Sequence, residues 1–337
     1  MMRHLIIPEL AADMQRAEEK LSEKLAPVSW DPAVCRILEE VRLAEGKMIR
    51  PQVLLLCGMC GSRYRENSDR ICVLAALVEM VHMASLIHDD IVDDSPFRRG
   101  RPTVQSAFGK DMAVYAGDLL LSRVMQVLFE EELVKEGRLF SAAIGQMCTG
   151  EIGQYDCCYR TDTGISRYMN NIYGKTAAVF ELSCRLGAMA GGCSPETTDV
   201  LAQFGRQLGL LFQIRDDLLD FTSYEEVDGK PGHMDFREGV LTLPVLYSLE
   251  CESVRPEIIQ LVCKARAAEL TKEDIRHLDA LLEESGGMEM ARQKAGELAV
   301  SSVRLAEQLP DPRIRSCFTG MIRQLSDVAG ERQDENE

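Results

Sequence analysis

The sequence predicts an all-α fold, a single bundle of helices, and three observations favour it. Aromatic residues make up only 6% of the 337 residues, while Ala, Leu and Met recur in long stretches, and this composition favours helices over strands. Amphipathic runs alternate with short breaks that contain Gly or Pro. No linker-like tract divides the chain. We therefore expect one domain over residues 1–337, with a polar, frayed tail at residues 330–337.

Two long runs should form the main helices of this bundle. Residues 68–94 are mostly apolar and contain no Gly or Pro, and residues 195–221 have similar length and content. Each run ends in an acidic cluster, so the two look like related halves of the bundle. Breaks that should end helices lie at residues 61–62, 95–96, 191–195, 228–232 and 286–287.

The net charge of -16 excludes several classes of partner. Binding a nucleic acid requires Lys and Arg to neutralise phosphates, so we expect no nucleic-acid partner and no bulk binding to anionic lipid. A local group of basic residues can still hold a small phosphorylated ligand, because such a site needs only a few charges at close range.

Cysteine usage and hydropathy predict a cytoplasmic protein. The twelve cysteines are scattered, and the first residues lack the apolar run and cleavage site of a signal peptide. We interpret the C-x-x-C of Cys57 and Cys60 as small buried hydrophobic residues, because no second pair lies at zinc spacing. No stretch reaches the roughly 18 uninterrupted apolar residues of a transmembrane helix, so any membrane contact should be peripheral.

Two acidic clusters, at residues 88–94 and 213–220, each contain D-D-x-x-D. Residues four apart share a helix face, so the first and last Asp of each motif should present their carboxylates side by side. Each cluster follows an apolar run, where acidic groups are costly unless a cation compensates them. Mg²⁺ commonly binds one or two carboxylates and completes its shell with water and phosphate, so we expect several Mg²⁺ ions that hold a diphosphate. The spacing does not match a calcium-binding EF-hand loop.

Basic residues follow short turns or glycines at four places in this acidic chain. Guanidinium groups bind phosphate oxygens in bidentate fashion, and the segment at residues 97–103 carries three Arg. Each of the other places would be weak evidence alone. The candidate phosphate ligands are Lys47, Arg50, Arg98, Arg99, Lys175 and Lys230.

These motifs together resemble the trans-prenyl diphosphate synthase family. They occur between residues 46 and 244 in the order G-K-x-x-R-P, H-x-x-S-L-I-H-D-D-x-x-D, R-R-G-R-P-T, G-D, G-K-T, F-Q-x-x-D-D-x-x-D, G-K-P and R-E-G-x-x-T-L-P. The resemblance implies an isoprenoid-synthase-type bundle with a central active-site cavity. It also implies a Mg²⁺-dependent enzyme that condenses an allylic diphosphate with isopentenyl diphosphate.

The resemblance assigns roles residue by residue. It implies that the magnesium ligands are Asp89, Asp90, Asp93, Asp216 and Asp220, with Asp217 supporting the second cluster. The allylic diphosphate would be held by Arg98, Lys175, Gln213 and Lys230, and Thr176 would help to seat its reacting end. The isopentenyl diphosphate ligands would be Lys47, Arg50, His82 and Arg99. The chain has Glu45 and Met48 where the family commonly has Gly and Arg, so its affinity for isopentenyl diphosphate should differ from the usual.

Small residues before the first cluster predict a long product. A bulky aromatic near the fifth position upstream of Asp89 blocks the growing tail in short-chain members, whereas this chain has Ala84 and Ser85 there. The tunnel should therefore extend by at least one turn, about 5.4 Å. Candidates for its floor are Leu77, Met80 and Val81, with Leu128 or Phe129 from a neighbouring helix.

The sequence around the first cluster looks most like heptaprenyl-type and octaprenyl-type synthases, which make quinone side chains from a farnesyl or geranylgeranyl primer. The alternatives are a short-chain farnesyl or geranylgeranyl synthase, the catalytic subunit of a heteromeric synthase, and a terpene cyclase or head-to-head condensing enzyme. The basic residues weigh against the last two enzymes, because neither needs an isopentenyl diphosphate site. We expect a homodimer.

Overall fold

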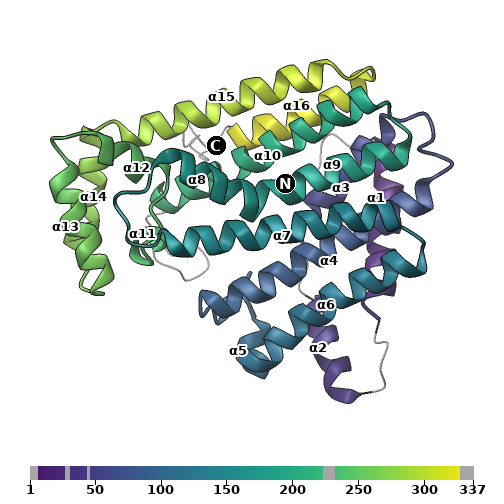
Figure 1. Cartoon of the computed structure of the whole chain (residues 1–337), viewed down its shortest axis with the longest axis horizontal. Coiled ribbons are helices and arrows are strands. Elements are labelled where there is room, and N and C mark those ends of the chain that lie inside the picture. The colour runs from purple at the N-terminus through teal and green to yellow at the C-terminus, as the bar shows by residue number, and fades with distance from the viewer. Residues whose placement is uncertain (1–6, 27–30, 44–45, 223–231, 327–337) are drawn as a thin grey trace, which may run out of the picture. The chain divides into compact units, whose positions relative to one another are not determined.

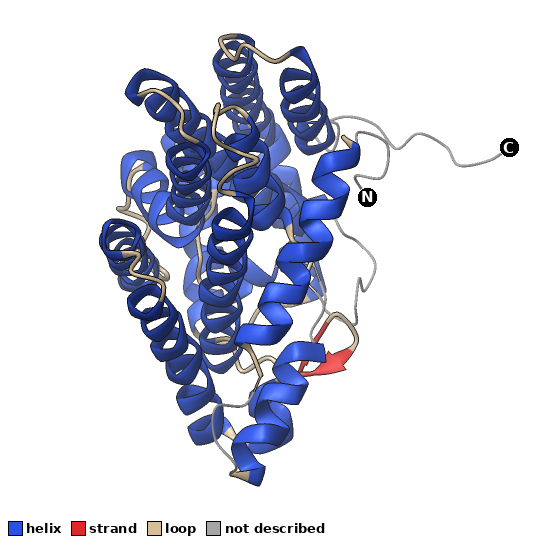
Figure 2. Ribbon diagram, turned by 90° about the vertical axis from the view of Figure 1, so that its right-hand side faces the viewer, coloured by secondary structure: helices blue, strands red, loops and turns tan. Residues whose placement is uncertain are grey.

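Helices dominate the computed structural model, which describes residues 7–26, 31–43, 46–222 and 232–326 (Figure 1). Among these residues the strands are limited to one short antiparallel hairpin, β1 (Phe97–Arg98) and β2 (Arg101–Pro102) (Figure 2). The all-α class is confirmed. The polar tail at residues 330–337 lies outside the described residues.

The helices up to the second acidic cluster are α1 (Pro8–Lys24), α2 (Pro32–Leu43), α3 (Ile49–Met59), α4 (Ser68–Val92), α5 (Val104–Phe108), α6 (Lys110–Glu130), α7 (Val134–Asp156), α8 (Ile165–Ile172), the π-helix η1 (Tyr173–Ala177), α9 (Ala178–Gly191) and α10 (Pro195–Thr222). The later helices are α11 (Met234–Arg237), α12 (Leu243–Glu250), α13 (Arg255–Arg266), α14 (Lys272–Glu284), α15 (Gly287–Glu307) and α16 (Pro312–Ser326).

The two long helices were predicted nearly to the residue. α10 ends one residue beyond the expected run, and α4 ends at Val92, two residues before the end of its run. Asp94 leaves the helix because its backbone is left-handed, with φ of 47°. The break expected at residues 286–287 is a single left-handed residue, Gly286, since Gly287 already belongs to α15. Most of the break at residues 228–232 lies outside the described residues.

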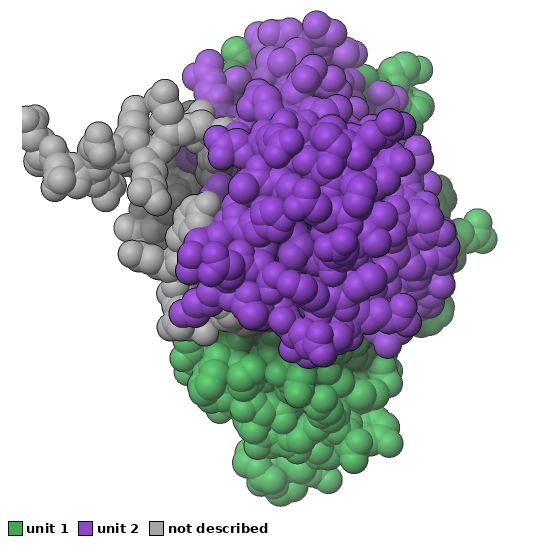
Figure 3. All heavy atoms as spheres, turned by 90° about the vertical axis from the view of Figure 1, so that its left-hand side faces the viewer, with its two compact units in different colours: residues 1–144, 179–202, 309–314 green, residues 145–178, 203–308, 315–337 purple. Residues whose placement is uncertain are grey.

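The chain forms two compact units (Figure 3). Unit 1 comprises residues 1–144, 179–202 and 309–314, and unit 2 comprises residues 145–178, 203–308 and 315–337. The first acidic cluster belongs to unit 1 and the second to unit 2. The single domain expected from the sequence stays a prediction.

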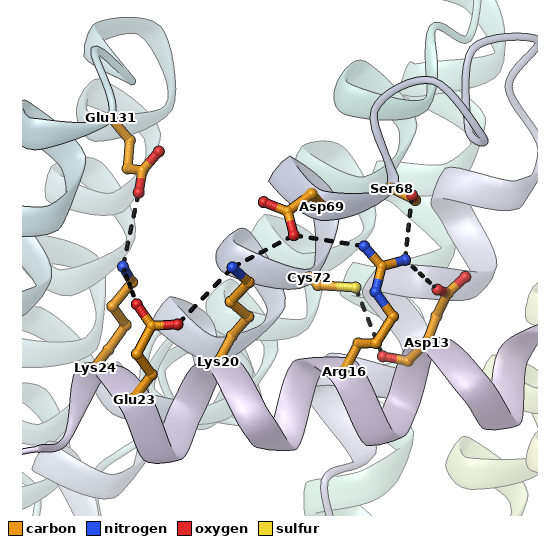
Figure 4. A network of polar contacts seen from close by, with 9 residues as sticks. All are labelled: Asp13, Arg16, Lys20, Glu23, Lys24, Ser68, Asp69, Cys72 and Glu131. Atoms are coloured by element: carbon orange, nitrogen blue, oxygen red, sulfur yellow. Dashed lines mark hydrogen bonds and ion pairs between the residues drawn. The ribbon is translucent and has the colours of Figure 1, made fainter.

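The core of unit 1 is built around α4. Every residue from Ile71 to Val81 in this helix is buried, and α4 packs against α1, α3, α5 and α6. The start of α4 is tied to α1 by polar contacts (Figure 4). Arg16 donates to Asp13 at 2.8 Å and to Ser68 at 3.2 Å. These contacts fix the N-terminal end of the helix that carries the first acidic cluster at its other end.

Helices α3 and α9, both in unit 1, cross with their backbones in contact. A Cβ atom at Gly187 would lie 2.0 Å from the carbonyl oxygen of Leu54, and one at Gly191 would lie 2.1 Å from that of Gly58. Only glycine allows so close an approach. Cys57 is fully buried at this crossing and Cys60 is half-buried. Their expected role as small apolar residues therefore holds fully for Cys57 and in part for Cys60.

Among the residues that the structure describes, two helices, α4 and α6, have the length and hydropathy of a membrane span. The most apolar 18-residue window of α4 is 72% buried inside the protein, which identifies α4 as a core helix. The corresponding window of α6 is 39% buried, so α6 presents an apolar face on its outer side. The length and mean hydropathy of a helix thus select two candidate membrane spans, whereas the criterion of an uninterrupted apolar run selected none.

Candidate diphosphate and metal site

The first acidic cluster lies at the C-terminal end of α4, where basic residues pair with Asp90 and Asp94. The Asp90 carboxylate is buried, and its Oδ1 accepts from Nε and Nη2 of Arg98, each at 2.8 Å. Asp94 Oδ1 lies 2.9 Å from Nζ of Lys110, and this ammonium group lowers the pKa of Asp94. In this structure the predicted metal ligand Asp90 and the predicted diphosphate ligand Arg98 bind each other.

Asp89 and Asp93 are separated by one helical turn. The Asp93 N–H donates to the Asp89 carbonyl at 2.8 Å, so helical spacing persists through Asp93 although α4 ends at Val92. Asp93 is exposed. The C-terminus of a helix is its negative pole, where each carboxylate costs about 0.3–1 kcal/mol. A cation bound by Asp89 and Asp93 would offset this cost.

The turn after α4 is held by two buried residues. Gln105 Nε2 donates to the carbonyl oxygens of Asp90 at 2.7 Å and Ser95 at 3.0 Å. Thr103 Oγ1 donates to the same Ser95 oxygen at 2.7 Å. These bonds fasten the hairpin that carries Arg98 to the end of α4. Sequence reasoning missed Gln105, because only its nearness to the R-R-G-R-P-T motif could have marked it.

A cavity of about 460 Å³ in unit 1 brings together residues expected to bind isopentenyl diphosphate. Of that set, His82 and Arg99 line it. The lining also includes Arg98, which was assigned to the allylic diphosphate, and Gly46, which immediately precedes the exposed Lys47. Burial lowers the pKa of His82 well below its ordinary value, and the nearby guanidinium groups lower it further. The imidazole is therefore neutral near pH 7 and adds no charge to the basic wall.

A buried carboxylate, Glu79, lies in the same cavity and was missed by sequence reasoning. Glu79 is 3% exposed, and burial raises its pKa while Arg50 and Arg99 oppose this rise. The Arg50 guanidinium also lies 4.8 Å from the ring centroid of the buried Phe180, a cation–π distance. The only signal in the sequence was one Glu inside an otherwise apolar run.

The second acidic cluster, in unit 2, is organised around the buried Asp217. Its Oδ2 accepts from the Tyr168 hydroxyl, and its Oδ1 accepts from Gln213 Nε2 at 2.8 Å. Gln213 Oε1 accepts in turn from Thr176 Oγ1 at 2.6 Å. Burial raises the pKa of Asp217 to about 6, although both hydrogen bonds favour the ionised form. The structure thus joins three predicted site residues in one chain and adds Tyr168, which the sequence did not indicate.

Asp216 and Asp220 differ sharply in their surroundings. Asp216 is exposed. Asp220 is half-buried, and its two carboxylate oxygens accept from the backbone N–H groups of Met234 at 3.0 Å and Asp235 at 3.1 Å. Asp235, which the sequence also did not indicate, has a raised pKa because it is buried and lies near Asp217 and Asp220. Such a concentration of carboxylates would be stabilised by a cation.

Lys175 and Thr176 belong to a π-helix, η1, between α8 and α9. Single π-turns frequently occur at functional sites. The Lys175 ammonium lies 3.3 Å from both carboxylate oxygens of Glu151 on α7. The backbones of α7 and η1 touch, because a Cβ at Gly150 would lie 2.3 Å from the Lys175 nitrogen. This close approach fixes the backbone of Lys175, the predicted diphosphate ligand, and therefore the point from which its side chain extends.

The residues expected to set product length are packed inside unit 1. Leu77, Met80, Val81 and Ala84 are buried, and the half-buried Ser85 donates its hydroxyl to the His82 carbonyl at 2.9 Å. None of the five lines the 460 Å³ cavity, and their role stays a prediction. Of the floor candidates on α6, Leu128 is buried and Phe129 is 69% exposed, and both line a second cavity in unit 1, of about 480 Å³.

Oxygen donors from Asp side chains characterise both clusters, and this chemistry fits Mg²⁺. Within the described ranges, no three His, Cys, Asp or Glu side chains are arranged to hold a metal ion by themselves. An ion would therefore need further ligands, such as phosphate oxygens and water. Lys230 lies outside the described residues.

Comparison with known proteins places these features in a family context. A family model described as polyprenyl synthetase matches residues 31–281. Heptaprenyl diphosphate synthase component 2 of Bacillus subtilis is 37% identical over 284 residues, which cover 84% of this chain and 79% of the relative.

Two solved structures extend the similarity to the fold. A decaprenyl diphosphate synthase from Rhodobacter capsulatus has a TM-score of 0.85 and 29% identity, and the match covers 96% of this chain and 98% of the other. A geranylgeranyl pyrophosphate synthase from Corynebacterium glutamicum, complexed with calcium and isoprenyl diphosphate, has a TM-score of 0.82 and 30% identity. That match covers 97% of this chain and 100% of the other.

Proposed function

The chain belongs to the polyprenyl synthetase family and is a trans-prenyltransferase, and from this premise we propose that Mg²⁺ and the acidic clusters bind its allylic substrate. The observation that carries the proposal is the buried Asp217 network at the end of α10. It connects Thr176 and Gln213, two predicted ligands of that substrate, directly to the second D-D-x-x-D motif.

The metal assignment is supported by the donor atoms. Asp89, Asp93, Asp216 and Asp220 offer oxygen ligands only, and in both clusters the first and last Asp lie one helical turn apart. Mg²⁺, when bound, neutralises charge on the diphosphate leaving group. The residues that would hold it are these four, while Asp90 is engaged by Arg98.

The protein's own residues would bind, orient and shield the substrates. Lys175 would hold the allylic diphosphate as its C–O bond breaks, and the Arg50, His82 and Arg99 group would bind isopentenyl diphosphate, whose double bond attacks the resulting carbocation. Loss of a proton then gives an allylic diphosphate longer by five carbons. The released diphosphate would accept that proton, so no protein base is assigned. The apolar face of α4 would exclude water, which would otherwise capture the cation.

We propose a long-chain product, made from a farnesyl or geranylgeranyl primer for quinone side chains. The small side chain of Ala84 supports a long product, because it leaves room for the growing chain. The relatives named for heptaprenyl and decaprenyl diphosphate synthesis also support a long product. A shorter product is the second candidate, because the solved structure from Corynebacterium glutamicum is a geranylgeranyl pyrophosphate synthase.

The proposed assembly is a homodimer that uses the outer face of α6 in unit 1. Tyr115 and Phe129 on α6 are 68% and 69% exposed, and Val134 at the start of α7 is 58% exposed. Phe129 and Val134 line one cavity, and Tyr115 lies about four turns earlier on the same helix. Exposed apolar patches commonly mark an interface. A heteromer is the alternative, because the Bacillus subtilis relative is called component 2.

We place the enzyme in the cytoplasm, with only peripheral membrane contact for product release.

The deciding experiment incubates the purified chain alone with Mg²⁺, labelled isopentenyl diphosphate and farnesyl diphosphate, and measures product lengths. We expect products longer than twenty carbons and a sedimentation coefficient of a dimer. Omission of Mg²⁺ is the control. Failure to extend the primer would refute catalysis by the chain alone. A Tyr115→Glu variant that sediments like the wild type would refute the α6 interface.

A further inference from the structure

His233 is one of seven described residues other than Gly with a positive φ, and it is the most buried of the seven. It is left-handed, with φ of 64° and ψ of 31°, and only 3% exposed. Residues other than Gly are uncommon in this region. Such strain persists where the surroundings over-determine the conformation, and it clusters at functional sites. Contacts with its surroundings must therefore hold His233 in this conformation.

Three contacts within unit 2 hold His233. Its Nε2 lies 2.7 Å from Oδ1 of Asp279 on α14. Its ring packs edge-on against Phe221, with centroids 5.2 Å apart. Its backbone N–H donates to the Asp220 carbonyl at 2.9 Å. The side chain is thus anchored to α14, while the backbone is anchored to the end of α10.

The anchoring of His233 also positions the two residues that follow it, Met234 and Asp235. The N–H groups of Met234 and Asp235 donate to separate oxygens of the Asp220 carboxylate. Because His233 directly precedes these donors, its conformation sets their direction. A carboxylate held through both oxygens cannot rotate freely, so its remaining lone pairs point in fixed directions.

We propose that His233 and Asp279 form a positioning pair that fixes the Asp220 carboxylate for cation binding. This inference rests on the proposed function, in which Asp220 is a magnesium ligand. Partners that orient a metal ligand typically contribute about 10-fold to 100-fold in metal affinity. Neither residue is among the proposed substrate ligands, so their effect would be exerted through Asp220.

The test uses metal-free protein and two measurements other than turnover. Hydrogen exchange reports whether the Met234 and Asp235 amides stay bonded, and calorimetry with Mn²⁺ and inorganic diphosphate reports cation affinity. For Asp279→Ala and His233→Gly we expect at least roughly tenfold faster exchange of both amides and about tenfold weaker Mn²⁺ binding. His233→Gly relieves backbone strain, so it separates the role of the imidazole from that of the left-handed turn.

Two controls make the result specific. Asp279→Asn keeps an oxygen that can accept from the imidazole, so exchange and affinity should stay within about twofold of the wild type. His277→Ala removes an equally short His–carboxylate contact, 2.7 Å to Glu257, that is exposed on the same helix α14. It should change neither measurement.

Wild-type exchange and wild-type Mn²⁺ affinity in Asp279→Ala would overturn the proposal, as would a His233→Gly protein that matches the wild type. The failure of the proposed function has a different signature. If Asp220→Ala binds Mn²⁺ as the wild type does, Asp220 is not a metal ligand. Exchange at Met234 and Asp235 would still decide whether the pair holds the turn.

Discussion

Removal of one hydroxyl, by Tyr168→Phe, should destabilise the metal-free protein more at pH 8 than at pH 5. Tyr168 donates to the buried Asp217 carboxylate. Burial raises the pKa of Asp217 from 3.8 to about 6, so the carboxyl group is protonated at pH 5 and ionised at pH 8 in the folded protein. The hydroxyl therefore serves a charged acceptor only at the higher pH.

The magnitude follows from the charge state of Asp217. The pKa of Asp217 is higher in the folded protein than in the unfolded chain, so its protonated form favours folding. This contribution, about 3 kcal/mol, is fully present below pH 4 and is lost as the pH rises through 6. The loss of a hydrogen bond to a charged group costs about 1.5–3 kcal/mol, whereas a neutral one costs about 1 kcal/mol. The variant should thus lose about 0.5–2 kcal/mol more at pH 8 than at pH 5.

Urea unfolding with a chelator at both pH values measures this difference. Tyr155→Phe is the matched control, because Tyr155 is 76% exposed and its loss should change stability by less than about 0.5 kcal/mol at either pH. Equal destabilisation by Tyr168→Phe at pH 5 and pH 8 would refute the assignment of a buried, titrating Asp217. The same result would remove the main electrostatic reason for a cation at this end of α10.

Three further substitutions test the proposed site. Asp89→Ala should lower kcat by about 100-fold or more with less than about 1 kcal/mol lost in unfolding, and unchanged turnover at saturating Mg²⁺ would contradict the metal role. Ala84→Tyr should shorten the products towards farnesyl diphosphate, as chromatography of the dephosphorylated products would show, at a packing cost of about 1–3 kcal/mol. An unaltered product distribution would argue against the open tunnel. Arg50→Lys should raise KM for isopentenyl diphosphate about tenfold through loss of the planar fork that lies over Phe180, whereas an unchanged KM would place that substrate elsewhere.

The sequence was most informative where the signal is local. An apolar run without Gly or Pro defines α4 because helix formation depends on neighbouring residues, and the D-D-x-x-D spacing follows from helical geometry. The sequence did not predict contacts between residues that are distant along the chain. The Tyr168 contact with Asp217 spans 49 positions, and the Asp90 contact with Arg98 depends on how a hairpin folds back. Neither leaves a periodic pattern.

The two kinds of error have different physical causes. Glu79 and Asp235 were missed because a single acidic residue carries no spacing to interpret, although burial raises the pKa of both. The sequence could not separate Leu128 from Phe129, because residue type does not reveal which side of a helix a residue occupies, and in the structure Leu128 is buried and Phe129 is exposed. The π-helix was unforeseen because its residues have the composition of an ordinary helix.

That π-helix means that the helical segment from Ile165 to Gly191 has absorbed one extra residue without breaking. Deletion of that residue would restore a regular α-helix, but it would rotate the part of the helix after the deletion by about 100° relative to the part before it. Either Thr176 would leave Gln213, or the buried side chains of α9 would leave their pockets. Lineages of this protein should therefore tolerate many exchanges of residue type here, but no change in length.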